Sequence, residues 1–100
     1  MAKNRLLFVW FEETDKTVIE KFQMILELNS WARLSTKAYV IRTEKTAEEI
    51  RDQLKKHWGL DTMLFVVDIT DSAWASFQIP SMVTDAIKTW QRKIEDDYYD

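Results

Sequence analysis

Three aspartates are the residues of this sequence whose type and spacing could do chemistry, because they bracket one apolar run. Asp61 precedes the run Met63–Ile69, while Asp68 and Asp71 lie at and beyond its end. Neighbouring carboxylates can bind a divalent cation or act as acid and base. Aspartates are also common where a strand ends, and this spacing matches no specific metal motif. Asp68 interrupts the apolar run itself, so it is kept as a weak catalytic candidate.

A second candidate group is basic and belongs to a predicted hairpin. It consists of Arg33, Lys37, Arg42 and Lys45, which a hairpin could gather on one edge. Such an edge can contact the phosphates of RNA or DNA. Its more usual meaning is a solvated edge that resists aggregation. The formal net charge of −3 provides no overall positive field, so nucleic acid is not the favoured partner.

The composition excludes several kinds of site. The 100 residues contain no Cys, which rules out disulfides, thiolate metal sites and a Cys nucleophile. One glycine cannot build a glycine-rich phosphate loop. The single histidine, His57, is expected on a helix surface and not in a metal site. The first apolar run is too short for a membrane span and lacks a cleavage site, so we expect a cytoplasmic protein without a cofactor.

Four short runs are the predicted strands that position these residues. They are Arg5–Phe11, Trp31–Leu34, Ala38–Arg42 and Met63–Ile69, the middle two forming a hairpin around residues 35–37. The first and last runs are continuously apolar, whereas a strand covered on one side alternates apolar with polar residues. Both faces of the sheet are therefore expected to be covered, by the sheet of a second protomer or by the C-terminal segment.

Two helices between the strands are predicted from their caps and from the spacing of apolar residues. Thr14 or Asp15 can begin an amphipathic helix that carries apolar residues from Val18 to Leu26. Thr46 and Glu49 have the spacing of a capping box, and the helix that follows is expected to end at Gly59 with a left-handed cap.

The C-terminal part of the chain is expected to add two elements and a tail. Trp74–Ile79 is predicted as a short extra strand that ends before Pro80. Ser81 is expected to cap a last helix that continues to Ile94. Residues 95–100 form an acidic tail that we expect to be frayed.

The order of these elements predicts an α+β fold. It is the ferredoxin-like βαββαβ arrangement, with a four-stranded antiparallel sheet, both helices on one face, and the extra strand and helix at the C-terminus. Residues 1–94 are expected to form a single domain. The first and third strands are central, and the fourth lies at an edge beside the first.

A homodimer is the expected assembly, because the apolar run Met63–Val67 would otherwise be exposed at a sheet edge. Trp74 and Phe77 can act as stacking platforms for bases, but aromatics at this spacing are more often packing anchors. In this interpretation, the segment around Trp74 from a second protomer lies along the edge. The residues expected at the interface are Trp10, Leu64, Val66, Trp74 and Phe77.

Part of the sequence resembles a known group of proteins. The segments are Ala38–Thr43, the helix sequence Ala-Glu-Glu-Ile-Arg-Asp-Gln-Leu beginning at Ala47, Leu64–Val67, and Ala73–Phe77. They resemble small bacterial and phage proteins labelled SinR-like. That group is distantly similar to the CRISPR-associated metal-dependent endoribonucleases and to the VapD toxin ribonucleases. The resemblance implies a ferredoxin-like homodimer whose last strand adds to the sheet of its partner.

The resemblance also implies where a nuclease site would lie. The nuclease relatives place an Asp at the end of the first strand, where two copies could hold a divalent ion such as Mg²⁺. The matching residue here is Phe11, and Glu12 follows it. A shift of one residue turns a side chain to the other face of a strand. We therefore expect a non-catalytic homodimeric module that regulates or inhibits an unknown protein in phage, toxin or CRISPR-like defence. The alternative is a metal-dependent endoribonuclease using Glu12 and Asp68.

Overall fold

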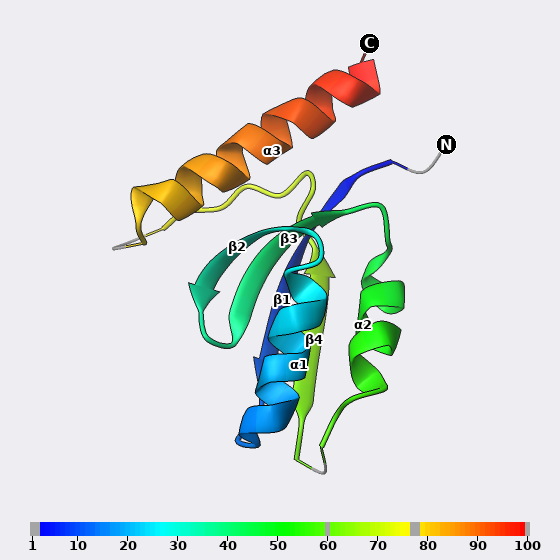
Figure 1. Ribbon diagram of the computed structural model, residues 1–100. Coiled ribbons are helices and arrows are strands. Elements are labelled where there is room, and N and C mark those ends of the chain that lie inside the picture. The colour runs from blue at the N-terminus through cyan, green and yellow to red at the C-terminus, as the bar shows by residue number, and fades with distance from the viewer. Residues whose placement is uncertain (1–2, 60, 77–78, 100) are drawn as a thin grey trace.

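The structure is a computed structural model that describes residues 3–59, 61–76 and 79–99, the last five without their side chains. Its elements are β1 (Arg5–Glu12), α1 (Lys16–Leu26), β2 (Ser30–Ser35), β3 (Ala38–Thr43), α2 (Ala47–Lys55), β4 (Met63–Asp68) and α3 (Ser81–Tyr99) (Figure 1). Within the described residues, no helix is both long enough and apolar enough to cross a membrane.

The four strands form one antiparallel sheet in the order β2-β3-β1-β4. The predicted α+β fold with a four-stranded antiparallel sheet and a C-terminal helix is therefore confirmed. β1 and β3 are the central strands, and β4 lies at an edge beside β1. The four strands begin and end within two residues of the runs predicted from the sequence.

The two faces of the sheet follow from the register of β1. Val9 lies opposite Tyr39 of β3 and Val66 of β4. Directly opposite residues of antiparallel strands point to the same side of the sheet, and neighbours along a strand point to opposite sides. One face therefore carries the odd-numbered residues of β1 and the other face carries the even-numbered ones.

The first face is closed by α1 and α2, and we call it the helix-pair face. Its core residues are completely buried: Leu7, Val9, Phe11, Phe22, Leu26, Tyr39, Ile41, Ile50 and Leu54. The rings of Phe11 and Phe22 meet edge to face with centroids 5.1 Å apart. This packing explains why the apolar residues of both helices recur every three or four positions.

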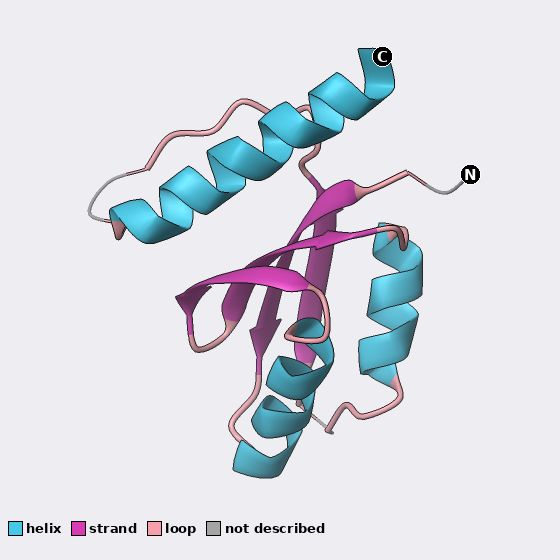
Figure 2. Ribbon diagram, turned by 45° about the horizontal axis from the view of Figure 1, so that its top comes forward, coloured by secondary structure: helices cyan, strands magenta, loops and turns pink. Residues whose placement is uncertain are grey.

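The second face is covered by α3, and we call it the α3 face. Leu6 and Val40 of the sheet pack there with Ile87 and Ile94 of the helix. Figures 1 and 2 show that α3 crosses the sheet near the end where β1 begins, whereas α1 and α2 lie on the opposite side. Of the two coverings expected for this face, the C-terminal segment is the one that the structure shows.

The short extra strand predicted at Trp74–Ile79 is wrong for the residues that the structure describes. Residues 74–76 are irregular, and Phe77 and Gln78 lie outside the described residues. This segment packs against α3, where the indole Nε1 of Trp74 donates to Oε1 of Gln91, 2.9 Å away. The expected strand is replaced by a connection that packs on its own C-terminal helix.

The helix ends agree with the sequence at two caps and differ elsewhere. Asp15 caps α1, and Thr46 with Glu49 forms the predicted capping box of α2. Ser81, expected as a cap, is the first residue of α3, and that helix continues through residues 95–99, where a frayed tail was expected. The left-handed cap expected at Gly59 is also wrong, because α2 ends at Lys55 with Lys56 in a right-handed conformation.

Candidate functional site

The two weak catalytic candidates, Glu12 and Asp68, lie at opposite ends of the β1 and β4 pair. Glu12 is opposite Met63, whereas Asp68 is opposite Leu7. These positions are five residue steps apart along β1, which corresponds to about 17 Å in an antiparallel strand. Within one chain these carboxylates therefore cannot share a metal ion or a substrate.

Each of these carboxylates also has its own partner. Nζ of Lys37 donates to Oε1 of Glu12 over 3.2 Å. The backbone N–H of Thr70 donates to Oδ1 of Asp68 over 2.9 Å, and Nε of Arg5 lies 3.9 Å from Oδ2. Glu12 thus joins the end of β1 to the hairpin turn, and Asp68 caps the turn after β4.

The remaining acidic candidates and the histidine are also dispersed. Asp61 precedes β4, Asp71 follows it, and exposed His57 lies just after α2. Across residues 3–59, 61–76 and 79–94, no three His, Asp or Glu side chains gather in a way that could hold a metal ion.

The four basic candidates are not gathered on one edge. Arg33 is opposite Tyr39 and shares its face, whereas Arg42 is opposite Leu6 on the α3 face. Lys37 lies in the hairpin turn, and Lys45 follows the other end of β3. Side chains alternate between the two faces along each strand of the hairpin, so the charges lie on both faces and at both ends of it. A nucleic-acid contact stays a prediction.

The residues expected at a dimer interface lie on different surfaces. Leu64 and Val66 are partly buried against the core of the helix-pair face. Trp10 is half-buried on the other face, and Trp74 packs against the α3 cluster. Phe77 lies outside the described residues.

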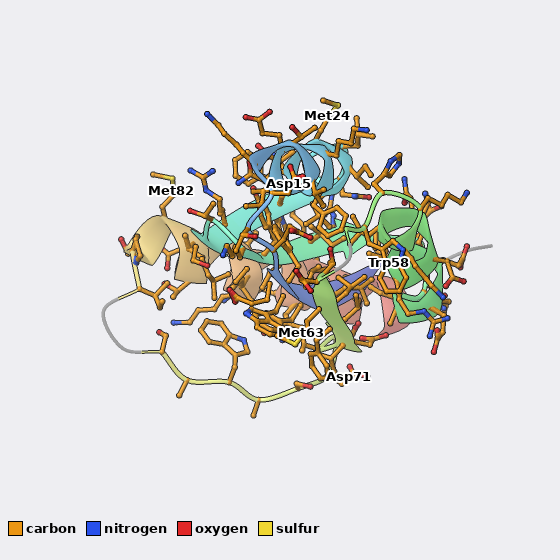
Figure 3. All side chains as sticks on the ribbon, turned by 90° about the horizontal axis from the view of Figure 1, so that it is seen from below. Asp15, Met24, Trp58, Met63, Asp71 and Met82 are labelled. Carbon is orange, nitrogen blue, oxygen red and sulfur yellow. The ribbon has the colours of Figure 1, made fainter. Side chains whose placement is uncertain are left out.

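The exposed apolar residues of β4 are instead Met63 and Phe65. Their exposed fractions are 55% and 56%, and Phe65 lies opposite Trp10 on the α3 face. Met63 projects on the side of the sheet away from α1, whose Met24 marks the opposite surface (Figure 3). We call Trp10, Met63 and Phe65 the β4 patch. Successive side chains of Met63–Val67 point to opposite faces of the sheet, but because all five are apolar the sequence does not show which face is exposed.

A carboxylate that the sequence did not single out is the most constrained one in the described residues. Glu13, at the end of β1, is 5% exposed. Its Oε1 accepts the backbone N–H groups of Thr14 and Asp15, each over 3.0 Å, and its Oε2 accepts the hydroxyl of Thr62. The Thr62 hydroxyl oxygen in turn accepts the N–H of Gly59 over 2.7 Å. Glu13, Gly59 and Thr62 are called the Glu13 cluster below.

The Glu13 cluster stabilises ionised Glu13. The hydrogen bond from Thr62 is the main reason that the pKa of Glu13 is lowered from its ordinary value of 4.5, and the N–H of Asp15 adds to the effect. A Cβ atom on residue 59 would lie 2.9 Å from Oε2 of Glu13, so a larger residue there would displace the carboxylate from its present position. Since both oxygens are occupied, the cluster ties two loops together and offers no free base.

The chain was compared with protein-family models, with curated proteins and with solved structures, and no match was found in any of the three comparisons. The resemblance to SinR-like proteins therefore stays a prediction.

Proposed function

We propose that this chain is a non-catalytic homodimeric interaction module whose two copies join through β4. The observation that carries the proposal is an edge strand on which Met63 and Phe65 are exposed. The βαββαβ order of the first six elements, with β1 and β3 central, supports a ferredoxin-like assignment as part of the same proposal. Nuclease activity is not proposed, because Glu12 and Asp68 lie far apart.

The outer edge of β4 is suited to strand addition. Among the described strands, β4 pairs with β1 alone, so its other edge presents backbone donors and acceptors. Such an edge readily accepts another strand, and alternate side chains then decide which strand fits. Beside it runs a groove of about 200 Å³ between α2 and β4, which is lined by Ala47, Glu48, Arg51, Leu64, Phe65 and Val66.

Among the registers that a second copy of β4 can take at this edge, the one centred on Phe65 matches the most apolar residues. Opposite residues must share a face, so a two-fold axis perpendicular to the sheet passes through one residue. An axis at Phe65 places the two Phe65 rings together, Met63 opposite Val67, and Leu64 opposite Val66. An axis at Val66 would place Leu64 opposite the charged Asp68. The Phe65 register therefore matches apolar residues on both faces.

The charges beside the edge also suit a second copy. Glu48 and Arg51 both line the groove next to β4 and carry opposite charges. A two-fold axis brings the α2 helices of the two copies near each other in opposite directions, so Glu48 of one copy can face Arg51 of the other. Such rim pairs contribute little affinity but help to set the register.

The biological role that follows is that of a regulator or inhibitor. A symmetric eight-stranded sheet would present the outer surfaces of both copies to a further protein. Under the SinR-like resemblance, that partner acts in phage, toxin or CRISPR-like defence.

Sedimentation velocity at micromolar concentration tests the dimer. We expect the wild type to be dimeric and Phe65→Glu to be a folded monomer, because Phe65 is exposed in a single copy. Met24→Glu is the matched control, since Met24 is an exposed apolar residue on the opposite surface. A monomeric wild type would contradict the proposal.

The register can be tested by cross-linking, because the chain has no Cys of its own. Phe65→Cys should form a disulfide between copies under mild oxidation, since paired residues lie about 4.5 to 5.5 Å apart at Cα, within disulfide range. Met63→Cys is the control, because its two copies would lie about 14 Å apart along the strands. Equal cross-linking of both variants would exclude the Phe65 register.

A further inference from the structure

A cavity of about 390 Å³ lies on the α3 face, and Val67 is the residue of β4 that lines it. Its floor is formed by the sheet, and its described walls are formed by residues 69, 74–76 and 79 after β4 and by α3. The residues that carry the argument are Phe8, Leu34, Val40, Val67, Trp74 and Ile87.

The cavity exists because α3 covers the sheet at one end only. Leu6 and Val40 are buried beneath Ile87 and Ile94, whereas Phe8, which lies between Leu6 and the uncovered end of β1, is only partly buried. The volume falls within the range of about 300 to 1,000 Å³ that is common for small-molecule sites. The lining is predominantly apolar, and the hydroxyl residues Ser76 and Thr84 also contribute to it.

The wall opposite the sheet is held in place by hydrogen bonds. The indole N–H of Trp74 donates to Gln91, and Nε2 of Gln91 donates to the carbonyls of Ile69 and Ser72 over 3.3 and 3.2 Å. Gln91 thus connects α3 with both ends of the turn after β4. A wall held in this way favours binding, because little conformational entropy is lost when a ligand enters.

A positive charge lies beside the same wall. Nζ of Lys88 is 6.0 Å from the centroid of the Trp74 ring, and Trp74 lines the cavity. Lys88 lies over the ring of Trp74 and does not line the cavity itself, but its charge can attract a negative group at the Trp74 end, while the apolar lining favours an apolar body.

We propose that this cavity binds a small molecule with an apolar body and one anionic group, which is the chemistry of a short fatty acid. The apolar body lies against Phe8, Val40 and Val67, and the anionic group lies at the rim near Lys88. The cavity lies within one copy of the chain, and Val67 is the residue that it shares with the register proposed for the dimer.

The test uses octanoate and octanol, which have the same alkyl length and differ in charge. Nuclear magnetic resonance titration follows the indole N–H signal of Trp74, which is identified by its loss in Trp74→Phe. We expect saturable shifts of this signal with octanoate and weaker binding of octanol. Lys88→Gln should weaken octanoate binding by about threefold to fivefold, the effect of one exposed charge, and leave octanol binding unchanged.

Val67→Trp tests the location by filling the cavity, and Met63→Trp is its control on the same strand and face. We expect the first variant to lose octanoate binding and the second to keep it, with the amide spectrum of each variant confirming that it is folded. The proposal is overturned if wild type binds neither compound, if folded Val67→Trp binds octanoate normally, or if octanol binds as tightly as octanoate. The proposal would also be overturned if octanoate shifted other signals of the wild type but not the Trp74 indole signal. This outcome does not depend on whether Val67→Trp folds.

Discussion

The two faces of the sheet are built from one strand and yet differ in how completely they are covered. On β1, Leu7, Val9 and Phe11 are completely buried beneath α1 and α2. On the other face, Leu6 is completely buried, but Phe8 and Trp10 are only partly buried. The difference arises because two helices lie along the first face, whereas α3 crosses one end of the second (Figure 1).

This difference separates stability from binding. The helix-pair face has the close packing that makes a core sensitive to the loss of single methylene groups. The α3 face has a cavity beside the helix and the exposed β4 patch beyond it. Both features are places where another molecule can bury apolar surface.

Replacing one phenylalanine of β1 on each face gives the largest expected effects. Phe11→Ala should lower the free energy of unfolding by about 3 to 5 kcal/mol, the cost of a large cavity in a closed core. Phe8→Ala should cost clearly less, because Phe8 is partly exposed and already borders a cavity. Urea unfolding measures both values. Equal costs would mean that the two faces are equally well packed.

The polar clusters of the two faces should respond differently to pH. Because the folded pKa of Glu13 is lowered, its ionised form stabilises the protein above pH 4.5, and this contribution is lost as the pH falls through the folded pKa. Glu13→Gln should therefore be less stable than wild type at pH 7, and the difference should shrink in acid. Urea unfolding at several pH values measures this.

The control for the Glu13 experiment is Gln91→Met on the α3 face. This change removes the hydrogen bonds to Trp74, Ile69 and Ser72 without adding a titratable group, so its cost should not depend on pH in the same range. A wild-type advantage over Glu13→Gln that stays constant from pH 7 to pH 3 would contradict the role of the ionised carboxylate.

Trp74→Ala should have an intermediate effect and should act on the α3 face alone. It should cost less than the 3 to 5 kcal/mol or so of a fully enclosed aromatic residue, because Trp74 is only partly buried. Hydrogen exchange should show faster opening of α3, and β1 should change less. Dimer formation should persist, because Trp74 packs within its own chain. A monomeric Trp74→Ala variant would instead show that Trp74 belongs to the dimer interface.

Loss of a helix cap should give the smallest effect. Thr46→Ala removes the capping box of α2 and should cost about 1 kcal/mol. Ser81→Ala in α3 should cost less, because Ser81 is the first helical residue and not the cap. Thermal unfolding of the two variants measures the difference. A larger cost for Ser81→Ala would show that the start of α3 depends on its hydroxyl.

Local patterns in the sequence were enough to locate the four strands of the sheet and the starts of α1 and α2, and they gave part of the topology. The capping box needs only Thr46 and Glu49, which lie three residues apart, and the four strands are marked by short apolar runs. The apolar residues on both faces of β1 also implied that both faces are covered. These features depend on neighbours along the chain, which the sequence contains directly.

Only the tertiary structure decided which side chains are exposed to solvent and which are buried. Every position from Met63 to Val67 is apolar, so alternation could not tell that Leu64 and Val66 face the helix pair while Phe65 is exposed. Pairing with β1 settles this, because Phe65 lies opposite Trp10 on the α3 face. Likewise, Glu12 and Glu13 look equivalent in the sequence. Only the approach of the Gly59–Thr62 loop makes Glu13 the buried carboxylate, because long-range contacts decide which side chain loses water.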